Sequence, residues 1–234
     1  MTVRFLNLYV AAVALCSLIF GIAARADDEL NHLRLGIERV VLHDSDSGFR
    51  GPGIPAGLYL GTKTEDFSTA YLSYARDLTR HLELELIAGI PPTFHVHARG
   101  PASLGAVPYA GTPLTSGKEM APAFTLNYKF NEPGAFYRPY VGVGLVYAHF
   151  YDLQDTSGTD AINGGPTRIH FTDSFGLVEV AGVSLRLMDH LYGQLGVTHA
   201  DVRPDVTVQT AGVTRLNHVD LNPLVFTAAF SYGF

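Results

Sequence analysis

The sequence predicts an all-β protein, an eight-stranded antiparallel transmembrane β-barrel with long external loops and short periplasmic turns. Segments of about ten residues alternate between apolar residues and small or polar ones, and long and short connections alternate between these segments. Apolar residues make up 47% of the chain and charged residues only 16%, against about 25% in soluble domains. Beyond the first segment, no apolar run approaches the roughly 20 residues that a membrane helix needs.

The first segment has the pattern of a secretory signal peptide. Arg4 gives it a positive start, an apolar run extends from Phe5 to Ile22, and Ala24-Arg25-Ala26 fits the small-x-small rule for cleavage after Ala26. We therefore expect a signal peptide over residues 1–26 and a barrel over residues 27–234. An uncleaved membrane anchor is the alternative for this segment.

The composition of the chain excludes some kinds of binding partner. Cys16 is the only cysteine and lies in the predicted signal peptide, so the mature chain is expected to form no disulfide and no cysteine metal site. Without Arg4 and Arg25, 14 basic residues remain against 22 acidic ones, a net charge of −8. This balance argues against nucleic acid as a partner. The exported chain is then either a soluble periplasmic β-protein or a barrel in the outer membrane.

The order of strands and connections favours the barrel. Eight strands are expected near residues 32–42, 67–76, 81–91, 120–130, 137–150, 169–187, 191–202 and 218–234. Short turns are expected at 77–80, 131–136 and 188–190, and long loops at 43–66, 92–119, 151–168 and 203–217. Long and short connections alternate strictly, as in a membrane barrel and not in a soluble sandwich. The last alternating strand ends on the aromatic Phe234, which resembles the signal that barrel-assembly machinery recognises.

Several segments resemble the OmpW family of small outer-membrane barrels, which includes alkane-uptake members. In chain order they are Glu85-Leu86-Ile87-Ala88, Arg138-Pro139-Tyr140-Val141-Gly142-Val143-Gly144, Asp173-Ser174-Phe175-Gly176-Leu177, and Leu221-Asn222-Pro223-Leu224-Val225-Phe226 with Tyr232-Gly233-Phe234. The resemblance implies an eight-stranded barrel with an unusually apolar interior, passive inward passage of small hydrophobic molecules, and a side opening into the membrane. It also implies an apolar constriction at Ile87 and Thr198, where Thr198 departs from the family's bulky aromatic.

Strand register and the resemblance together give the candidate residues for ligand passage. They are Ile87, Phe175, Thr198, Tyr71, Val143 and Val178, with Leu145 and Val180 also expected on the inner face. Eight strands enclose an interior just wide enough for side chains or one small ligand, so an apolar lumen suits a hydrophobic guest. Glu83 and Glu85 are expected to be solvated lumen residues near the periplasmic side.

A metal site, an enzyme and a surface adhesin have weaker support in the sequence. His95 and His97 point the same way in an extended segment, but no neighbouring acidic residue or cysteine completes a metal site. Ser184, His199 and Asp201 are the residues that a lipid-modifying enzyme would use, but no motif joins them. The long loops leave a surface adhesin or structural barrel open.

We therefore expect a monomeric outer-membrane channel without catalytic activity or a cofactor. Its partners would be outer-membrane lipid and small hydrophobic solutes, which the loops 92–119 and 151–168 would collect.

Overall fold

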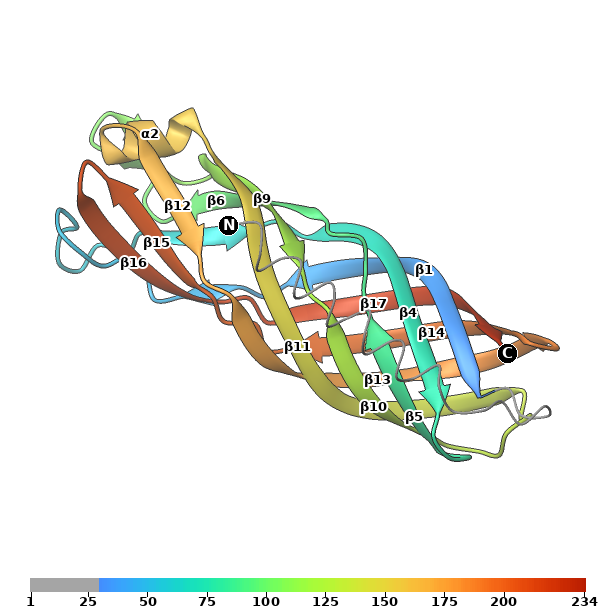
Figure 1. The fold of residues 1–234 in the computed structure, drawn as a ribbon. Helices are drawn as coiled ribbons and strands as arrows, with labels where there is room; N and C mark the ends of the chain where they lie inside the picture. Colours follow the sequence, from blue (N-terminus) through green and yellow to red (C-terminus); the bar gives the residue numbers. More distant parts are fainter. Residues whose placement is uncertain (1–29) are drawn as a thin grey trace, which may run out of the picture.

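The computed structural model describes residues 30–234, so the predicted cleavage after Ala26 lies outside the described residues. Figure 1 shows an elongated molecule in which long strands form a barrel at one end and shorter strands form a head at the other. In this part of the chain, no helix is both long enough and apolar enough to cross a membrane.

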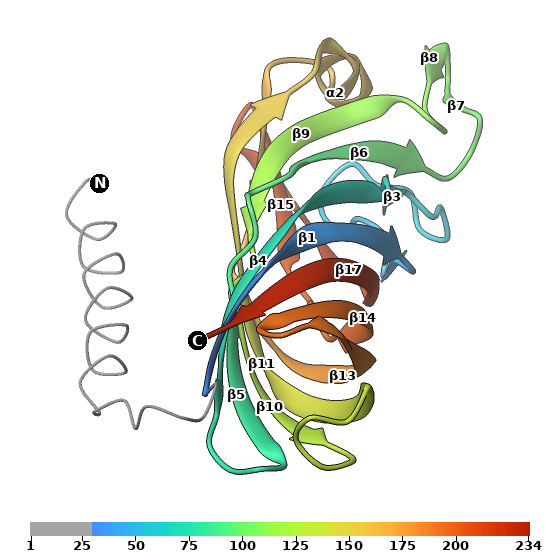
Figure 2. The same ribbon diagram turned by 90° about the vertical axis from the view of Figure 1, so that its right-hand side faces the viewer.

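Eight antiparallel strands close the barrel, as predicted. In order around the ring they are β10 (Ala123–Lys129), β5 (Leu82–Ile87), β4 (Phe67–Asp77), β1 (Asn31–Leu42), β17 (Pro223–Gly233), β14 (Leu191–Ala200), β13 (Ser174–Met188) and β11 (Tyr137–Asp155). The ring closes between β10 and β11, where Ala123 lies opposite Val146 and Lys129 opposite Tyr140. A closed ring leaves no edge of unpaired backbone groups, as a bilayer requires. Figure 2 shows β1, β17, β14 and β13 side by side in the wall.

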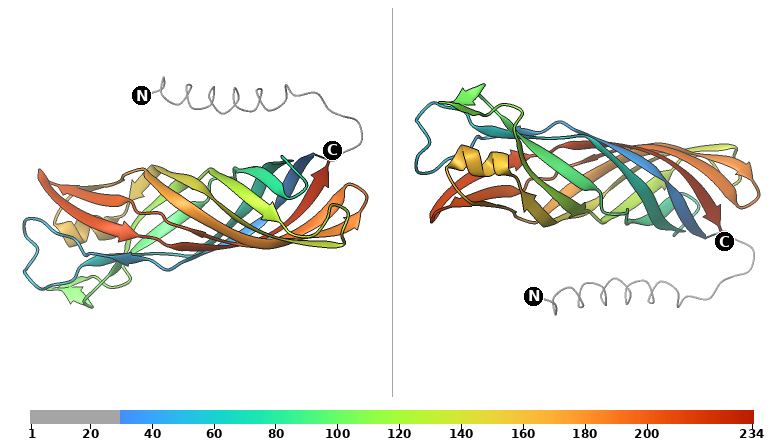
Figure 3. Two further views of the ribbon diagram at one scale, coloured as in Figure 1. Left: turned by 90° about the horizontal axis from the view of Figure 1, so that it is seen from below. Right: turned by 90° about the horizontal axis from the view of Figure 1, so that it is seen from above.

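The four long connections form the head, at the opposite end of the molecule from Phe234 (Figure 3). Its elements are β2 (Ser45–Asp46), β3 (Gly61–Thr64), β6 (Thr93–Arg99), β7 (Ser103–Leu104), β8 (Val107–Pro108), β9 (Pro113–Met120), α2 (Ser157–Asn163), β12 (Thr167–Phe171), β15 (Asp205–Thr210) and β16 (Val213–Asp220). The sequence predicted long loops here but not these strands, which form because the segments also alternate. Val96 in β6 and Val206 and Val208 in β15 are buried between more exposed polar neighbours.

The outward face of the barrel is apolar. Leu35 of β1 lies opposite Phe230 of β17, and both side chains are exposed. Tyr128, Tyr232 and Phe234 add exposed aromatic side chains toward the end of the barrel that carries the short turns. An apolar surface of this extent is unfavourable in water and fits the lipid-facing wall of a membrane barrel with an aromatic girdle.

Candidate functional site: a divided lumen

A buried ion-pair network fills the lumen near the short turns. Arg34 of β1 reaches two carboxylates of β5, with its Nη2 2.6 Å from Glu83 Oε2 and its Nη1 2.7 Å from Glu85 Oε1. Lys129 of β10 lies 2.5 Å from Glu83 Oε2 and 2.6 Å from Asp77 Oδ1. Alternation along each strand places these residues inside, because their neighbours face lipid.

Neutral side chains donate further hydrogen bonds to these carboxylates. Asn127 donates to Glu83 at 3.2 Å and to Glu85 at 3.0 Å. Ser73 donates to Glu85 at 2.5 Å, and the Tyr71 hydroxyl donates to the same oxygen. Glu83 and Glu85 therefore lie in the lumen as predicted, but they are buried and paired instead of solvated. Charges held this tightly close the lower lumen to an apolar solute.

Above the network, the lumen opens into an apolar cavity of about 130 Å³, which we call the inner chamber. Its lining includes Val40, Ile87, Ala123, Val146, Val178, Thr198, Ala200, Val202 and Leu221. An apolar cavity of about 150 Å³ is large enough to hold benzene, so the inner chamber suits a guest of that size. Two carboxylates, Glu38 of β1 and Glu119 of β9, also line it.

A second cavity lies within the head. It measures about 90 Å³, and we call it the outer cavity. Its lining includes Leu104, Tyr109 and Leu114 from the connection 92–119, and Thr159, Ile162 and Asn163 from the connection 151–168. Thr156 caps the N-terminus of α2 by accepting a hydrogen bond from the backbone N–H of Thr159, and this contact orders the second connection around the cavity.

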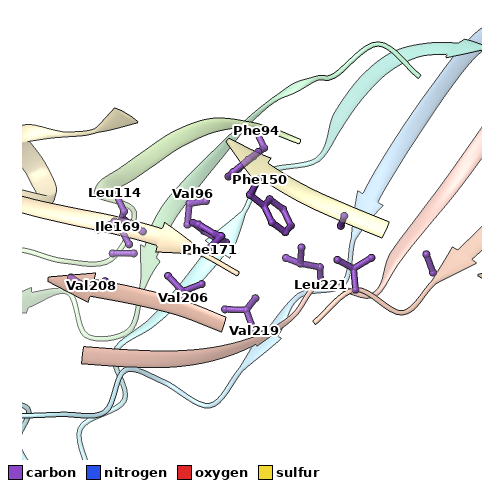
Figure 4. Close-up of a cluster of buried hydrophobic side chains, with 14 of the residues drawn as sticks. Phe94, Val96, Leu114, Phe150, Ile169, Phe171, Val206, Val208, Val219 and Leu221 are labelled. Carbon is purple, nitrogen blue, oxygen red and sulfur yellow. The ribbon is translucent and has the colours of Figure 1, made fainter. Parts of the chain in front are cut away.

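Three phenylalanines lie between the two cavities. Phe94, Phe150 and Phe171 contact one another, with ring centroids 5.8, 5.7 and 5.4 Å apart. In Figure 4 they lie between Ile169, which lines the outer cavity, and Leu221, which lines the inner chamber. The buried apolar core is therefore a continuous column that runs from the head into the barrel and contains both cavities.

The barrel wall is weakly joined beside the inner chamber. The pairing of β5 with β10 ends at Ile87 opposite Ala123, and the pairing of β6 with β9 begins at Thr93 opposite Lys118. Between these points, residues 88–91 and 120–122 share no backbone hydrogen bond within the described chain. Prolines 91, 92 and 122 lie in or beside this gap and have no N–H to donate. Ile90 lines the chamber and is also exposed on the outside, so the chamber reaches the wall at the gap.

The predicted passage residues fall into three groups. Ile87, Val178 and Thr198 meet in the lining of the inner chamber. Tyr71 also points inward, but its hydroxyl belongs to the ion-pair network. Phe175 and Val143 point outward, with 80% and 64% of their surfaces exposed, so their predicted placement in the lumen was wrong.

The error at Val143 and Phe175 has a steric cause. Opposite positions in the wall share a face, and Val143 pairs with Glu179 while Phe175 pairs with Tyr147. Glycines 142 and 144 take the inward positions, because a Cβ at Gly144 would lie 2.0 Å from the backbone oxygen of Phe124. The run from Val141 to Leu145 therefore turns its apolar side chains to lipid, and Leu145 was also wrongly placed inside.

The residues considered for catalysis are not brought together. Ser184 is buried inside the barrel opposite Gln194, whereas His199 lies five positions further along β14 on the outer face. Of the metal candidates, His95 is exposed and His97 lies 3.5 Å from Glu65.

Sequence reasoning missed a different group of three potential metal ligands. Ligand atoms of His32, Asp77 and Glu83 lie within 4.8 Å of one another, but the Lys129 ammonium contacts both of these carboxylates. A cation would have to displace Lys129 from this position.

The geometry agrees with comparison to known proteins. A model of the OmpW family matches residues 33–234. The chain belongs to the OmpW family. Outer membrane protein W of Vibrio cholerae is 30% identical over 156 residues, which cover 67% of this chain and 69% of that protein. Outer membrane protein W of Salmonella typhimurium is 26% identical over 226 residues, covering 96% and 98%.

Solved structures share the fold. OprG from Pseudomonas aeruginosa matches with a TM-score of 0.77 at 21% identity, over 87% of this chain and 95% of that one. AlkL in lipid bilayers matches with a TM-score of 0.58 at 17% identity, over 91% and 94%. This member of the OmpW family is therefore an outer-membrane β-barrel protein, with its short turns on the periplasmic side and its head outside the cell.

Proposed function

We propose that this protein carries small hydrophobic molecules passively across the outer membrane through the inner chamber. The observation that carries the proposal is the division of the lumen, in which an apolar cavity lies directly above a buried ion-pair network. An apolar molecule gains free energy by leaving water for the chamber, at about 25 cal/mol for each Å² of apolar surface buried. No covalent chemistry and no cofactor enter this function.

Entry would begin at the outer cavity. All four long connections contribute to its lining, including the two that the sequence predicts to collect ligand, and the lining side chains are mainly apolar. Passage from there to the inner chamber requires Phe94, Phe150 and Phe171 to part, since their rings fill the space between the cavities.

Exit would be sideways into the membrane. The ion-pair network blocks the straight path to the periplasm, because an apolar solute there would separate Arg34 from Glu83 and Glu85. The gap between residues 88–91 and 120–122 offers the alternative, since opening it breaks no backbone hydrogen bond between the two segments. A molecule leaving there passes from one apolar environment to another.

The test compares the uptake of a long-chain alkane and of a small sugar by cells with and without the protein. We expect faster entry of the alkane alone. Thr198→Asp should lower alkane entry by about tenfold, equivalent to about 1.4 kcal/mol, because it places a charge in the inner chamber. Thr198→Val keeps the shape without a charge and should leave entry unchanged.

Equal alkane uptake with and without the protein would refute the proposal and favour a surface adhesin. Unchanged uptake by Thr198→Asp alone would remove the inner chamber from the path. The mobility of unheated protein in gel electrophoresis reports in each case whether the barrel has formed.

A further inference from the structure

The inner chamber combines an apolar wall with two carboxylates that have no basic partner. Glu38 lines it from β1 and Glu119 from β9. Among the described residues, no Lys, Arg or His lines this cavity. Carboxylates are rarely enclosed by a protein without a pairing cation, because leaving water is costly for a charged group.

The two carboxylates have few polar partners. Glu38 accepts one hydrogen bond, from the Thr227 hydroxyl at 3.3 Å. Within residues 30–234, the Glu119 side chain makes no hydrogen bond or ion pair, and the other groups around it in the chamber are mainly apolar. Nearby Lys118 points the other way, toward Asp152 on the outer surface at 3.6 Å.

In the lower lumen, by contrast, the buried acidic residues are paired with basic side chains. Glu83 contacts both Arg34 and Lys129, and Glu85 contacts Arg34. These bases are held below the chamber by their own contacts and do not line it. The unpaired acids therefore belong to the part of the lumen that is open to a guest.

We propose that the inner chamber prefers amphiphilic amines, molecules with a small apolar body and one ammonium group, over neutral or anionic molecules of the same size. The apolar wall takes the body, and Glu38 and Glu119 supply the missing countercharge. This inference rests on the proposed function, because it assumes that hydrophobic molecules enter the chamber. The cavity has room for an apolar body of about one six-membered ring.

The test uses benzylamine, benzyl alcohol and benzoate, which share one ring and differ in charge. The full chain is placed in zwitterionic lipid nanodiscs at pH 8, and binding is followed by ring-current shifts of the methyl groups of Ile87 and Val178, which line the chamber. We expect benzylamine to bind at least about tenfold more tightly than benzyl alcohol, and benzoate to produce no shift.

Glu38→Gln and Glu119→Gln, singly and together, remove the countercharge and keep the shape. The double variant should bind benzylamine no more tightly than benzyl alcohol, and each single variant should lose part of the preference. Glu132→Gln is the matched control, because Glu132 is an exposed acid at the periplasmic end. It should leave the preference intact.

The outcomes separate this inference from the proposed function. Equal binding of benzylamine and benzyl alcohol to the wild type, or a preference that survives in the double variant, overturns the inference while the proposed function stands. Binding of benzylamine alone supports the inference and contradicts a general route for neutral hydrophobic molecules. If neither compound shifts the methyl groups, both proposals fail.

Discussion

The same residue type has two roles in this lumen, and the neighbours of each residue decide which one it has. Glu83 and Glu85 lie among basic side chains and close the barrel, whereas Glu38 and Glu119 lie among apolar ones. The spacing of Glu83 and Glu85 on one strand indicates that they face the lumen. It does not indicate their partners, because Arg34 and Lys129 come from strands about 50 residues away.

Glu119 gives the residue-scale prediction. Burial raises the pKa of the Glu119 carboxyl to about 7, so this group is largely neutral at pH 6 and largely ionised at pH 8. Binding of an amine that stays protonated over this range should therefore strengthen as the pH rises through 7. Benzylamine titrations at pH 6 and pH 8 measure this, and Glu119→Gln should reduce the difference.

Of the other charged groups near Glu119, only Glu38 faces the inner chamber. Glu38 shares the chamber with it, and the groups on the surrounding strands that face outward are Lys118 on β9, His95 on β6, and His149 and Asp152 on β11. Binding that weakens as the pH rises, or a pH dependence unchanged in Glu119→Gln, would contradict the assignment.

At the scale of the element, close contact between strands fixes which side chains can face inward. A Cβ at Gly144 of β11 would lie 2.0 Å from the backbone oxygen of Phe124 in β10, and a backbone atom cannot move aside as a side chain can. Gly144→Ala should therefore destabilise the barrel by about 1–3 kcal/mol through overpacking. Urea unfolding in detergent, followed by gel mobility, measures the loss.

Gly193→Ala provides the control on β14. Its added Cβ would have nothing nearer than a side-chain carbon of Leu187 at 3.6 Å, an ordinary contact. Equal stability of the two variants would mean that the wall adapts at Gly144 and that the contact does not set the register.

The eight barrel strands could be predicted because each alternates with a period of two and ends at a recognisable turn. The head strands were missed because the Gly, Pro and His content of the long connections hid the alternation around Val96 and Val206. The inward and outward positions of β11 were exchanged in the prediction. An alternation of valine and glycine does not by itself show which of the two residues faces the lumen. Only the distance to β10 decides that the glycines face inward.

At the scale of the whole molecule, the proposed function assigns the passage of hydrophobic solutes to the inner chamber and the exclusion of ions to the ion-pair network. The candidate site could be predicted in part, since Ile87, Val178 and Thr198 do line one cavity. The Phe94, Phe150 and Phe171 cluster could not, because its members come from three separate strands, β6, β11 and β12, that meet only in the folded head.

The network should therefore control ion leakage. We expect the wild type to show almost no ion conductance in a planar bilayer, because paired charges fill the lower lumen. Removing both signs together, with Arg34→Ala, Asp77→Ala, Glu83→Ala, Glu85→Ala and Lys129→Ala in one variant, avoids leaving a single buried carboxylate or ammonium and opens a path for water. Conductance should then rise clearly above the wild-type baseline.

The variant Arg39→Ala with Asp66→Ala removes an exposed ion pair from the outer surface and should conduct no better than the wild type. A network variant that forms a barrel and stays silent would place the barrier to ions higher in the lumen, at the phenylalanine cluster, and would remove the argument that solutes must leave sideways.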